Sequence, residues 1–152
     1  MKAGELCSRE VVTTTPDMSI QEAARLMRDN HVGCLIVVKE VDGQVEPAGI
    51  LTDRDIVIEL IAKDVPIEDV SVGDVMSFAV LKVTEAETVF ATAQRMRSRG
   101  VRRVPVVSTT GALVGVLALD DILSLLGEEL SLLAKLTRRE AEQETKKRNL
   151  PC

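Results

Sequence analysis

The sequence predicts a mixed α/β fold of the α+β type, in which two copies of one β-α-β-β-α unit pack sheet to sheet with pseudo-twofold symmetry. Three observations predict this fold. A pattern of glycine, apolar and acidic positions occurs twice, and within each copy the apolar spacing changes between that of a helix and that of strands. A leucine-rich and then charged segment follows the second copy, which predicts a C-terminal helical extension.

The internal repeat rests on matched positions at a fixed offset. An offset of 69 residues aligns the apolar positions Ile20, Ala24, Met27 and Val32 with Val89, Ala93, Met96 and Val101. After a longer loop in the first copy the offset falls to 66, which aligns Gly49 with Gly115 and Asp55 with Asp121. One such unit is too small to bury a good core alone, so we expect the two copies to complete each other.

Each copy is expected to contain the same elements in the same order. Apolar strands are predicted at 11–13 and 80–82, helices at 19–30 and 88–99, strand pairs at 34–39 with 48–51 and at 104–107 with 113–117, and second helices from Asp53 and Leu119. Gly43 and Gly111 mark the turns between the paired strands. Ser19, followed three residues later by Glu22, is typical of a capping box at the start of the first helix.

The chain is predicted to divide into a first repeat at 5–62, a linker at 63–74, a second repeat at 75–127 and a charged helical extension at 128–152. In the extension and the helix before it, Ile122, Leu126, Leu130 and Leu133 form one helical stripe. Two interpretations stay open. The helix packs at its start and frays into solvent, or it meets the same helix of a second subunit.

Composition argues against several classes of function. The net charge is -5, the pI is about 5.0 and aromatic residues make up 1% of the chain. Nucleic-acid binding needs basic side chains for phosphates or aromatic rings for bases, so we predict no nucleic-acid partner. Apolar stretches are only a few residues long and the start has no apolar signal region, so we expect a cytoplasmic protein without a membrane partner.

The sequence offers little for metal or catalytic chemistry. Cys7, Cys34 and Cys152 lack the spacing of metal ligands, and we expect no structural disulfide in a reducing compartment. The only histidine, His31, follows a predicted helix and is expected to complement the helix dipole. No third group is placed to orient it as a catalytic base, so no catalytic residue and no enzymatic activity are predicted.

The strand-to-helix junction of the first copy, Gly49 to Asp55, carries a hydroxyl and a carboxylate three residues apart. Thr52 can donate to a phosphate oxygen, and the free N–H groups at the helix start favour an anion. Asp55 can accept hydrogen bonds from two ribose hydroxyls. Alternatively, Thr52 caps the helix and Asp55 complements its dipole, and local chemistry does not decide between the two. The second copy has Ala118 in place of the hydroxyl.

The pattern of Gly, two apolar residues, Ser/Thr, two residues and Asp in the first copy resembles the CBS domain, as do the strand Val104-Pro105-Val106-Val107 and the start of the second copy at Asp74-Val75-Met76-Ser77. The resemblance covers about 5–127, so the chain resembles a stand-alone CBS pair, or Bateman module. It implies a non-enzymatic regulatory protein of signal transduction or energy sensing that binds an adenosine-containing ligand such as AMP, ADP, ATP, NAD or S-adenosylmethionine. It implies no catalytic cofactor, and it implies a homodimer and a separate target protein as partners.

The resemblance also implies two binding clefts between the repeats. Cleft A would use Thr52, Asp53, Arg54, Asp55, Ser77, Phe78, Ala79, Arg102 and Arg103. Cleft B would use Ser8, Arg9, Glu10, Gly33, Cys34, Ala118, Asp120 and Asp121. Because Arg is the preferred planar donor for phosphate, cleft A is expected to hold the more phosphorylated ligand. The alternative interpretation is that Arg102 and Arg103 are solvated charges at the end of a strand and bind no ligand.

Two further functional hypotheses differ in class from a nucleotide sensor. The chain is a structural dimerisation module with vestigial, empty clefts, or it is an enzyme acting on a nucleotide. The enzyme would need a general base, and the sequence offers none of obvious placement.

Overall fold

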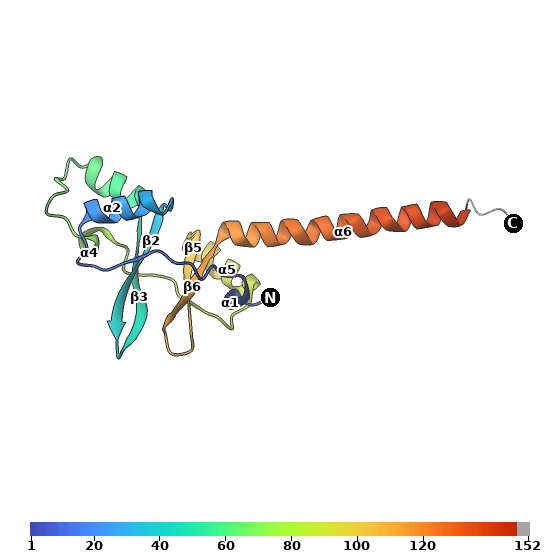
Figure 1. The fold of residues 1–152 in the computed structure, drawn as a ribbon, viewed down its shortest axis with the longest axis horizontal. Coiled ribbons are helices and arrows are strands. Elements are labelled where there is room, and N and C mark those ends of the chain that lie inside the picture. Colours follow the sequence, from blue (N-terminus) through green and yellow to red (C-terminus); the bar gives the residue numbers. More distant parts are fainter. Residues whose placement is uncertain (149–152) are drawn as a thin grey trace.

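The computed structural model describes residues 1–148 and contains two three-stranded sheets, one from each copy of the repeat (Figure 1). The strand orders are β1-β2-β3 and β4-β5-β6. In each sheet the first strand pairs in parallel with the second, and the second pairs antiparallel with the third. The predicted α+β fold with two matching units is confirmed. Cys152 lies outside the described residues.

The elements of the two repeats follow the same order, and each repeat begins with a single helical turn. In the first repeat they are α1 (Ala3–Leu6), β1 (Thr13–Thr14), α2 (Ile20–Asp29), β2 (Cys34–Val41), β3 (Gln44–Thr52), α3 (Asp53–Ile56) and the π-helical turn η1 (Val57–Ile61). In the second they are α4 (Val72–Val75), β4 (Val83–Thr84), α5 (Val89–Arg99), β5 (Arg103–Val107), β6 (Leu113–Ala118) and α6 (Leu119–Arg148). Helix α4 begins within the stretch predicted as linker.

The first strand of each repeat lies later in the chain than predicted. Strands were expected at 11–13 and 80–82, but β1 is Thr13–Thr14 and β4 is Val83–Thr84. Only these two-residue segments pair with β2 and β5. The apolar residues just before them line cavities between the repeats instead: Val11 and Val12 on one side, Val80 and Leu81 on the other. Apolar character was therefore a correct sign of burial and a wrong sign of strand pairing.

The predicted helices are confirmed, together with the capping box predicted at Ser19. Ser19 Oγ accepts a hydrogen bond from the Glu22 N–H at 3.2 Å, and Glu22 Oε2 accepts one from the Ser19 N–H at 3.3 Å. Both helices are followed by a residue with left-handed backbone, His31 with φ 55° and Gly100 with φ 65°. The positions correspond in the two repeats, but only glycine adopts this conformation without steric cost.

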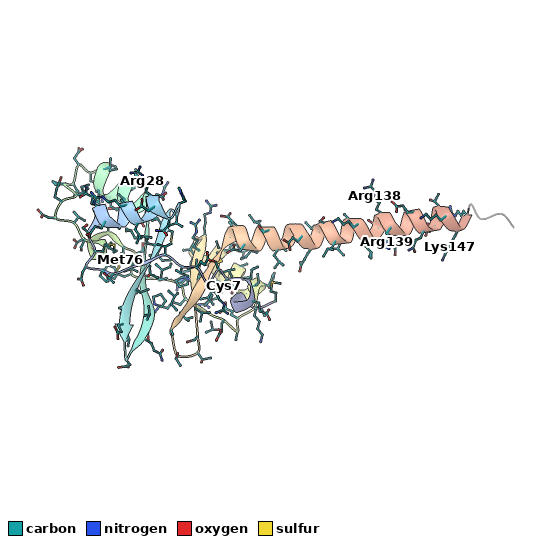
Figure 2. All side chains as sticks on the ribbon, viewed as in Figure 1. Cys7, Arg28, Met76, Arg138, Arg139 and Lys147 are labelled. Atoms are coloured by element: carbon teal, nitrogen blue, oxygen red, sulfur yellow. The ribbon has the colours of Figure 1, made fainter. Side chains whose placement is uncertain are left out.

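The two repeats exchange their leading segments. Ala3 and Cys7, from the start of the chain, are buried in the hydrophobic cluster of the second repeat. Val72 and Met76, which precede the second repeat, are buried in the cluster of the first. Figure 2 shows Met76 and Cys7 in these two separate bodies. Neither repeat therefore has a complete core without chain from the other.

Backbone hydrogen bonds fix this exchange at matching positions. Ser8 and Val116 exchange two bonds, both of 2.9 Å. Ser77 and Ile50 exchange bonds of 2.9 and 3.2 Å. Each pair joins a leading segment to the last strand of the other repeat. The two crossings therefore lie beside the two strand-to-helix junctions.

The glycine shared by both junctions is required by this crossing. A Cβ on Gly115 would lie 2.5 Å from the Ser8 carbonyl oxygen and 2.7 Å from Cys7 Sγ. A Cβ on Gly49 would lie 2.7 Å from Met76 Sδ and 3.0 Å from the Ser77 carbonyl oxygen. The close contact at Gly115 is with backbone, which moves less readily than a methionine side chain.

Helix α6 runs from the second repeat far beyond the rest of the protein (Figure 1). Ile122 is buried and Leu125 is partly buried against the second repeat, whereas Leu126 and all later described residues are exposed. The predicted stripe lies within α6, and it is buried at Ile122 and exposed at Leu126, Leu130 and Leu133. The helix continues through the charged segment to Arg148. Within residues 1–148, no helix is long and apolar enough to span a membrane.

We predict that Gly115→Ala destabilises the fold by about 1–3 kcal/mol, because the new methyl group forces backbone to move. Gly49→Ala should cost less, since Met76 can change rotamer. As a control, Gly127→Ala places the methyl group in open space within α6 and should not destabilise. Urea denaturation of the three variants measures the order. Equal stability of Gly115→Ala and wild type would contradict the crossing described above.

Candidate functional site

A cavity of about 430 Å³ lies between the first repeat and the start of the second, and we refer to it as cleft A. Eight of its predicted residues line it: Thr52, Asp53, Arg54, Asp55, Ser77, Ala79, Arg102 and Arg103. Phe78 is not among the lining residues, and its side chain is 69% exposed. The volume lies in the range of ordinary small-molecule sites.

Thr52 and Asp55 hold each other in place at the start of α3. The Thr52 N–H and hydroxyl both donate to Asp55 Oδ2 at 2.8 Å, and the Asp55 N–H donates to Thr52 Oγ1 at 3.2 Å. This reciprocal pair is a capping box. Two of these bonds end on Asp55 Oδ2 and the third ends on Thr52 Oγ1. Asp55 Oδ1 takes no part in them, so it can accept a hydrogen bond from a ligand, such as a sugar hydroxyl.

The charges around cleft A favour an anion. Three arginines line it, Arg54, Arg102 and Arg103, against the two carboxylates of Asp53 and Asp55. Arg102 Nη2 lies 3.7 Å from Asp120 Oδ1, and both side chains are mostly exposed, at 73% and 64%. An exposed ion pair of this length contributes little stability, so Arg102 is free to turn toward a ligand.

A second cavity, of about 270 Å³, lies at the matching position of the other repeat and is called cleft B. Six of its predicted residues line it: Ser8, Glu10, Gly33, Cys34, Ala118 and Asp121. Arg9 and Asp120 do not, and Asp120 contacts Arg102 instead. Asp121 Oδ2 accepts a hydrogen bond from the Ala118 N–H at 2.8 Å, so the carboxylate keeps its place although the hydroxyl is missing.

The two clefts share a wall that the sequence did not reveal. Gly33, Cys34 and Arg103 line both cavities. Cys34 and Arg103 are 69 positions apart and open β2 and β5, so they occupy the same place in the two repeats. Related residues that meet between related cavities lie near the pseudo-twofold axis. Arg103, assigned from sequence to cleft A alone, is therefore in reach of both.

The pKa of the Cys34 thiol depends on the groups that form this wall. Burial raises its pKa, and the Arg103 guanidinium partly offsets the rise by attracting the thiolate, while Asp55 and Asp53 add to it. Burial also raises the pKa of the Cys7 thiol, with Arg9 opposing. The folded-state pKa is above the unfolded one. The stability that each thiol contributes is therefore present below about pH 8.5 and is lost as the pH rises through the folded pKa.

His31 also lines cleft B, where no role had been predicted for it. Its counterpart Gly100 lines cleft A. Alignment of the two repeats carries a signal for this position, because His31 stands where the second repeat has Gly100, and glycine after a helix indicates a left-handed backbone. Cleft B thus has an imidazole and one guanidinium as donors, facing the carboxylates of Glu10 and Asp121. It is the less positive of the two cavities.

In the described part of the chain, no group of three or more His, Cys, Asp or Glu side chains is close enough together to hold an ion. The clefts offer hydrogen-bonding groups and guanidinium groups to a ligand.

Comparison with known proteins agrees with this geometry. Residues 3–62 and 72–128 each match the CBS domain. The chain belongs to the CBS domain family. An uncharacterized protein of Methanopyrus kandleri is 35% identical over 123 residues, which are 81% of this chain and 61% of that protein. The chain thus spans less than two thirds of this relative.

Relatives also include enzymes that carry CBS domains as a part. The inosine-5'-monophosphate dehydrogenase of Methanocaldococcus jannaschii is 31% identical over 122 residues, but these make up only 23% of that enzyme. The match covers its CBS part and not the remainder. Stand-alone CBS-domain proteins are generally non-enzymatic, and CBS pairs are regulatory modules.

Solved CBS structures share the fold and bind or assemble in different ways. The CBS domain pair of protein MJ0100, solved with 5-methylthioadenosine and S-adenosyl-L-methionine, has a TM-score of 0.71 and 27% identity and covers 85% of this chain and 98% of its own. The hexameric CBS-CP12 protein from bloom-forming cyanobacteria has a TM-score of 0.71 and 27% identity and covers 81% and 69%. CBS pairs can thus bind adenosine-containing ligands and form oligomers.

The shared wall makes a prediction that needs no ligand. Arg103→Gln should raise the pKa of the Cys34 thiol further, because the opposing guanidinium is lost. Alkylation by iodoacetamide across a pH series, with the modified cysteine identified by mass spectrometry, measures this. Arg102→Gln is the matched control and should leave the Cys34 profile in place. Identical profiles for Arg103→Gln and wild type would show that the guanidinium does not lie beside the thiol.

Proposed function

We propose that this CBS pair is a non-enzymatic regulatory protein that binds an adenosine-containing nucleotide between its repeats and transmits occupancy to a partner protein. The observation that carries the proposal is the composition of cleft A. A carboxylate from α3 and two arginines from the start of β5 reach one cavity from different repeats. A ribose suits the carboxylate and a phosphate suits the guanidinium groups.

The two ends of a nucleotide would meet different parts of the cleft. Arg102 and Arg103 would face the anionic part. The sequence expectation of free N–H groups at this helix start is wrong, because the N–H groups of Asp53, Arg54 and Asp55 already donate to the Gly33 carbonyl oxygen, Asp53 Oδ1 and Thr52 Oγ1. The adenine would lie against Ser77 and Ala79, whose segment already exchanges backbone bonds with Ile50. Because such a ligand touches both repeats, its binding would favour the packing in which they are in contact.

Cleft B is proposed to take a less phosphorylated ligand, or the same ligand more weakly. It has Arg103 and His31 as donors, where cleft A has three arginines. Loss of one hydrogen bond to a charged group costs about 1.5–3 kcal/mol, or roughly tenfold or more in affinity. AMP, ADP, ATP, NAD and S-adenosylmethionine all remain candidates, and a homodimer that acts on a separate target protein in the cytoplasm completes the proposal.

One observation favours a different function. Thr52 and Asp55 satisfy each other as a helix cap without a ligand. A structural dimerisation module with empty clefts would keep the pair for this reason alone. The two functions differ in whether adenine nucleotides stabilise the protein.

We predict that AMP or ATP raises the melting temperature of the wild type and that Asp55→Ala abolishes most of the shift. At a hundredfold excess over Kd the stabilisation is about 2.7 kcal/mol. The control is Asp74→Ala, because Asp74 forms the same kind of capping box with Ser71 at 2.9 and 3.0 Å but lines neither cleft. Both variants lose a cap, and only Asp55→Ala should lose the ligand response. Equal responses in wild type and Asp55→Ala would remove cleft A as the site.

The shared wall gives a second prediction about ligand binding. In titration calorimetry with AMP, Arg103→Gln should lower the affinity of both clefts by about tenfold, and Arg102→Gln that of cleft A alone. An Asp55→Ala background isolates cleft B. For phosphorylated ligands, Asp121→Ala should matter less than Asp55→Ala. A selective effect of Arg103→Gln on cleft A, or equal losses from the two aspartate variants, would contradict this ranking of the clefts.

A further inference from the structure

The only histidine of the chain, His31, lines cleft B with a side chain that is free to meet a ligand. It also lines a hollow between α2 and α3, to which Arg28 and Asp53 contribute one charge of each sign. The residue is exposed, and none of the residues 1–148 forms a hydrogen bond or an ion pair with its imidazole. Both ring nitrogens are therefore available to a ligand in cleft B.

The backbone at His31 has a conformation that favours glycine. The His31 N–H donates to the Arg28 carbonyl oxygen at 3.3 Å, and at the matching turn the Gly100 N–H donates to that of Arg97 at 3.2 Å. The φ angles are 55° and 65°. A residue with a Cβ loses stability in this left-handed conformation, so glycine would be the better residue for the turn alone. Backbone strain of this kind gathers at binding sites, which points to a function for the imidazole.

With a neutral imidazole, cleft B has one negative charge in excess. Its lining contains the carboxylates of Glu10 and Asp121 and the single guanidinium group of Arg103. Cleft A has three guanidinium groups against two carboxylates. A proton on His31 brings the lining of cleft B to neutrality and makes both ring nitrogens donors. An anionic ligand therefore gains more from this proton in cleft B than any uncharged ligand does.

The imidazole is also the group in this cavity that changes its charge near neutral pH. Histidine does so between about pH 5.5 and 8, a range in which carboxylates and guanidinium groups keep their charges. Burial raises the pKa of the Cys34 thiol, which therefore stays neutral in this range. In the hollow between α2 and α3, Arg28 and Asp53 keep their opposite charges.

We propose that His31 determines how strongly cleft B binds a phosphorylated ligand, and that protonation of its imidazole strengthens this binding as the pH falls. The inference rests on the proposed function, because it needs a nucleotide between the repeats. Cleft A has Gly100 at the matching position, so binding there does not gain in this way. The pair would thus respond to nucleotide in both clefts and to pH through cleft B.

The first test compares the affinity of cleft B for AMP at about pH 6 and pH 8 by titration calorimetry in the Asp55→Ala background. His31→Gln keeps a hydrogen-bonding side chain but cannot take up a charge. The ratio of the two affinities should be roughly three- to tenfold larger with His31 than with His31→Gln. The phosphate of AMP also titrates near pH 6, but this effect is the same for both proteins and cancels in the comparison.

The second test transfers the imidazole to cleft A. A Cβ on Gly100 would meet nothing within 4 Å, so Gly100→His fits the matching turn. In an Asp121→Ala background, Gly100→His should increase the ratio of the AMP affinities of cleft A at the two pH values by a similar factor. Circular dichroism at both pH values checks that each variant is folded. An unchanged ratio would overturn the claim that an imidazole at this position governs anion binding.

A third readout uses the wild type alone and needs no variant to fold. Its imidazole ¹H signals come from His31 only, and addition of AMP at about pH 6 should move them. Signals that stay in place while calorimetry detects binding would confine AMP to cleft A. That result, or equal affinity ratios for His31 and His31→Gln, would overturn the inference and leave the proposed function intact. Absence of AMP binding at both pH values would overturn both.

Discussion

The structure depends on the exchange of leading segments between the two repeats. Ala3 and Cys7 complete the core of the second repeat, and Val72 and Met76 complete that of the first. At each crossing the incoming backbone bonds to the last strand, and glycine at position 49 or 115 leaves room for it. Because burial of apolar surface dominates folding stability, neither half can retain its core when the halves separate. Both repeats are therefore needed for a complete hydrophobic core, whatever binds between them.

The same exchange positions the clefts. Each crossing places a leading segment beside the strand-to-helix junction of the other repeat, so each cavity is walled by both. Pseudo-twofold symmetry makes the cavities equivalent in backbone, and side chains then differentiate them. The pseudo-twofold axis relates Thr52 to Ala118, and it relates Arg102 and Arg103 to Gly33 and Cys34. It also relates Gly100 to His31. Cys34 and Arg103, near the axis, line both cavities.

Much of this could be predicted from sequence, and the failures share a cause. The repeat, the helices with their caps and the paired strands follow from local patterns at Ser19, Gly49 and their counterparts. Sequence misplaced β1 and β4 because the apolar residues before them are buried by the cleft walls and not by strand pairing. It missed Arg103 in cleft B, since the packing of distant elements decides which side chains line that cavity. The nucleotide roles of the cleft residues stay a prediction.

The most direct measurement is a titration of the ¹⁵N-labelled protein with AMP, followed by backbone amide chemical shifts. If a nucleotide lies between the repeats, the largest shifts will occur together at Thr52 and Asp55 in one repeat and at Ser77, Arg102 and Arg103 in the other. Shifts confined to one repeat, or a spectrum unchanged by every adenosine ligand at saturating concentration, would contradict the account.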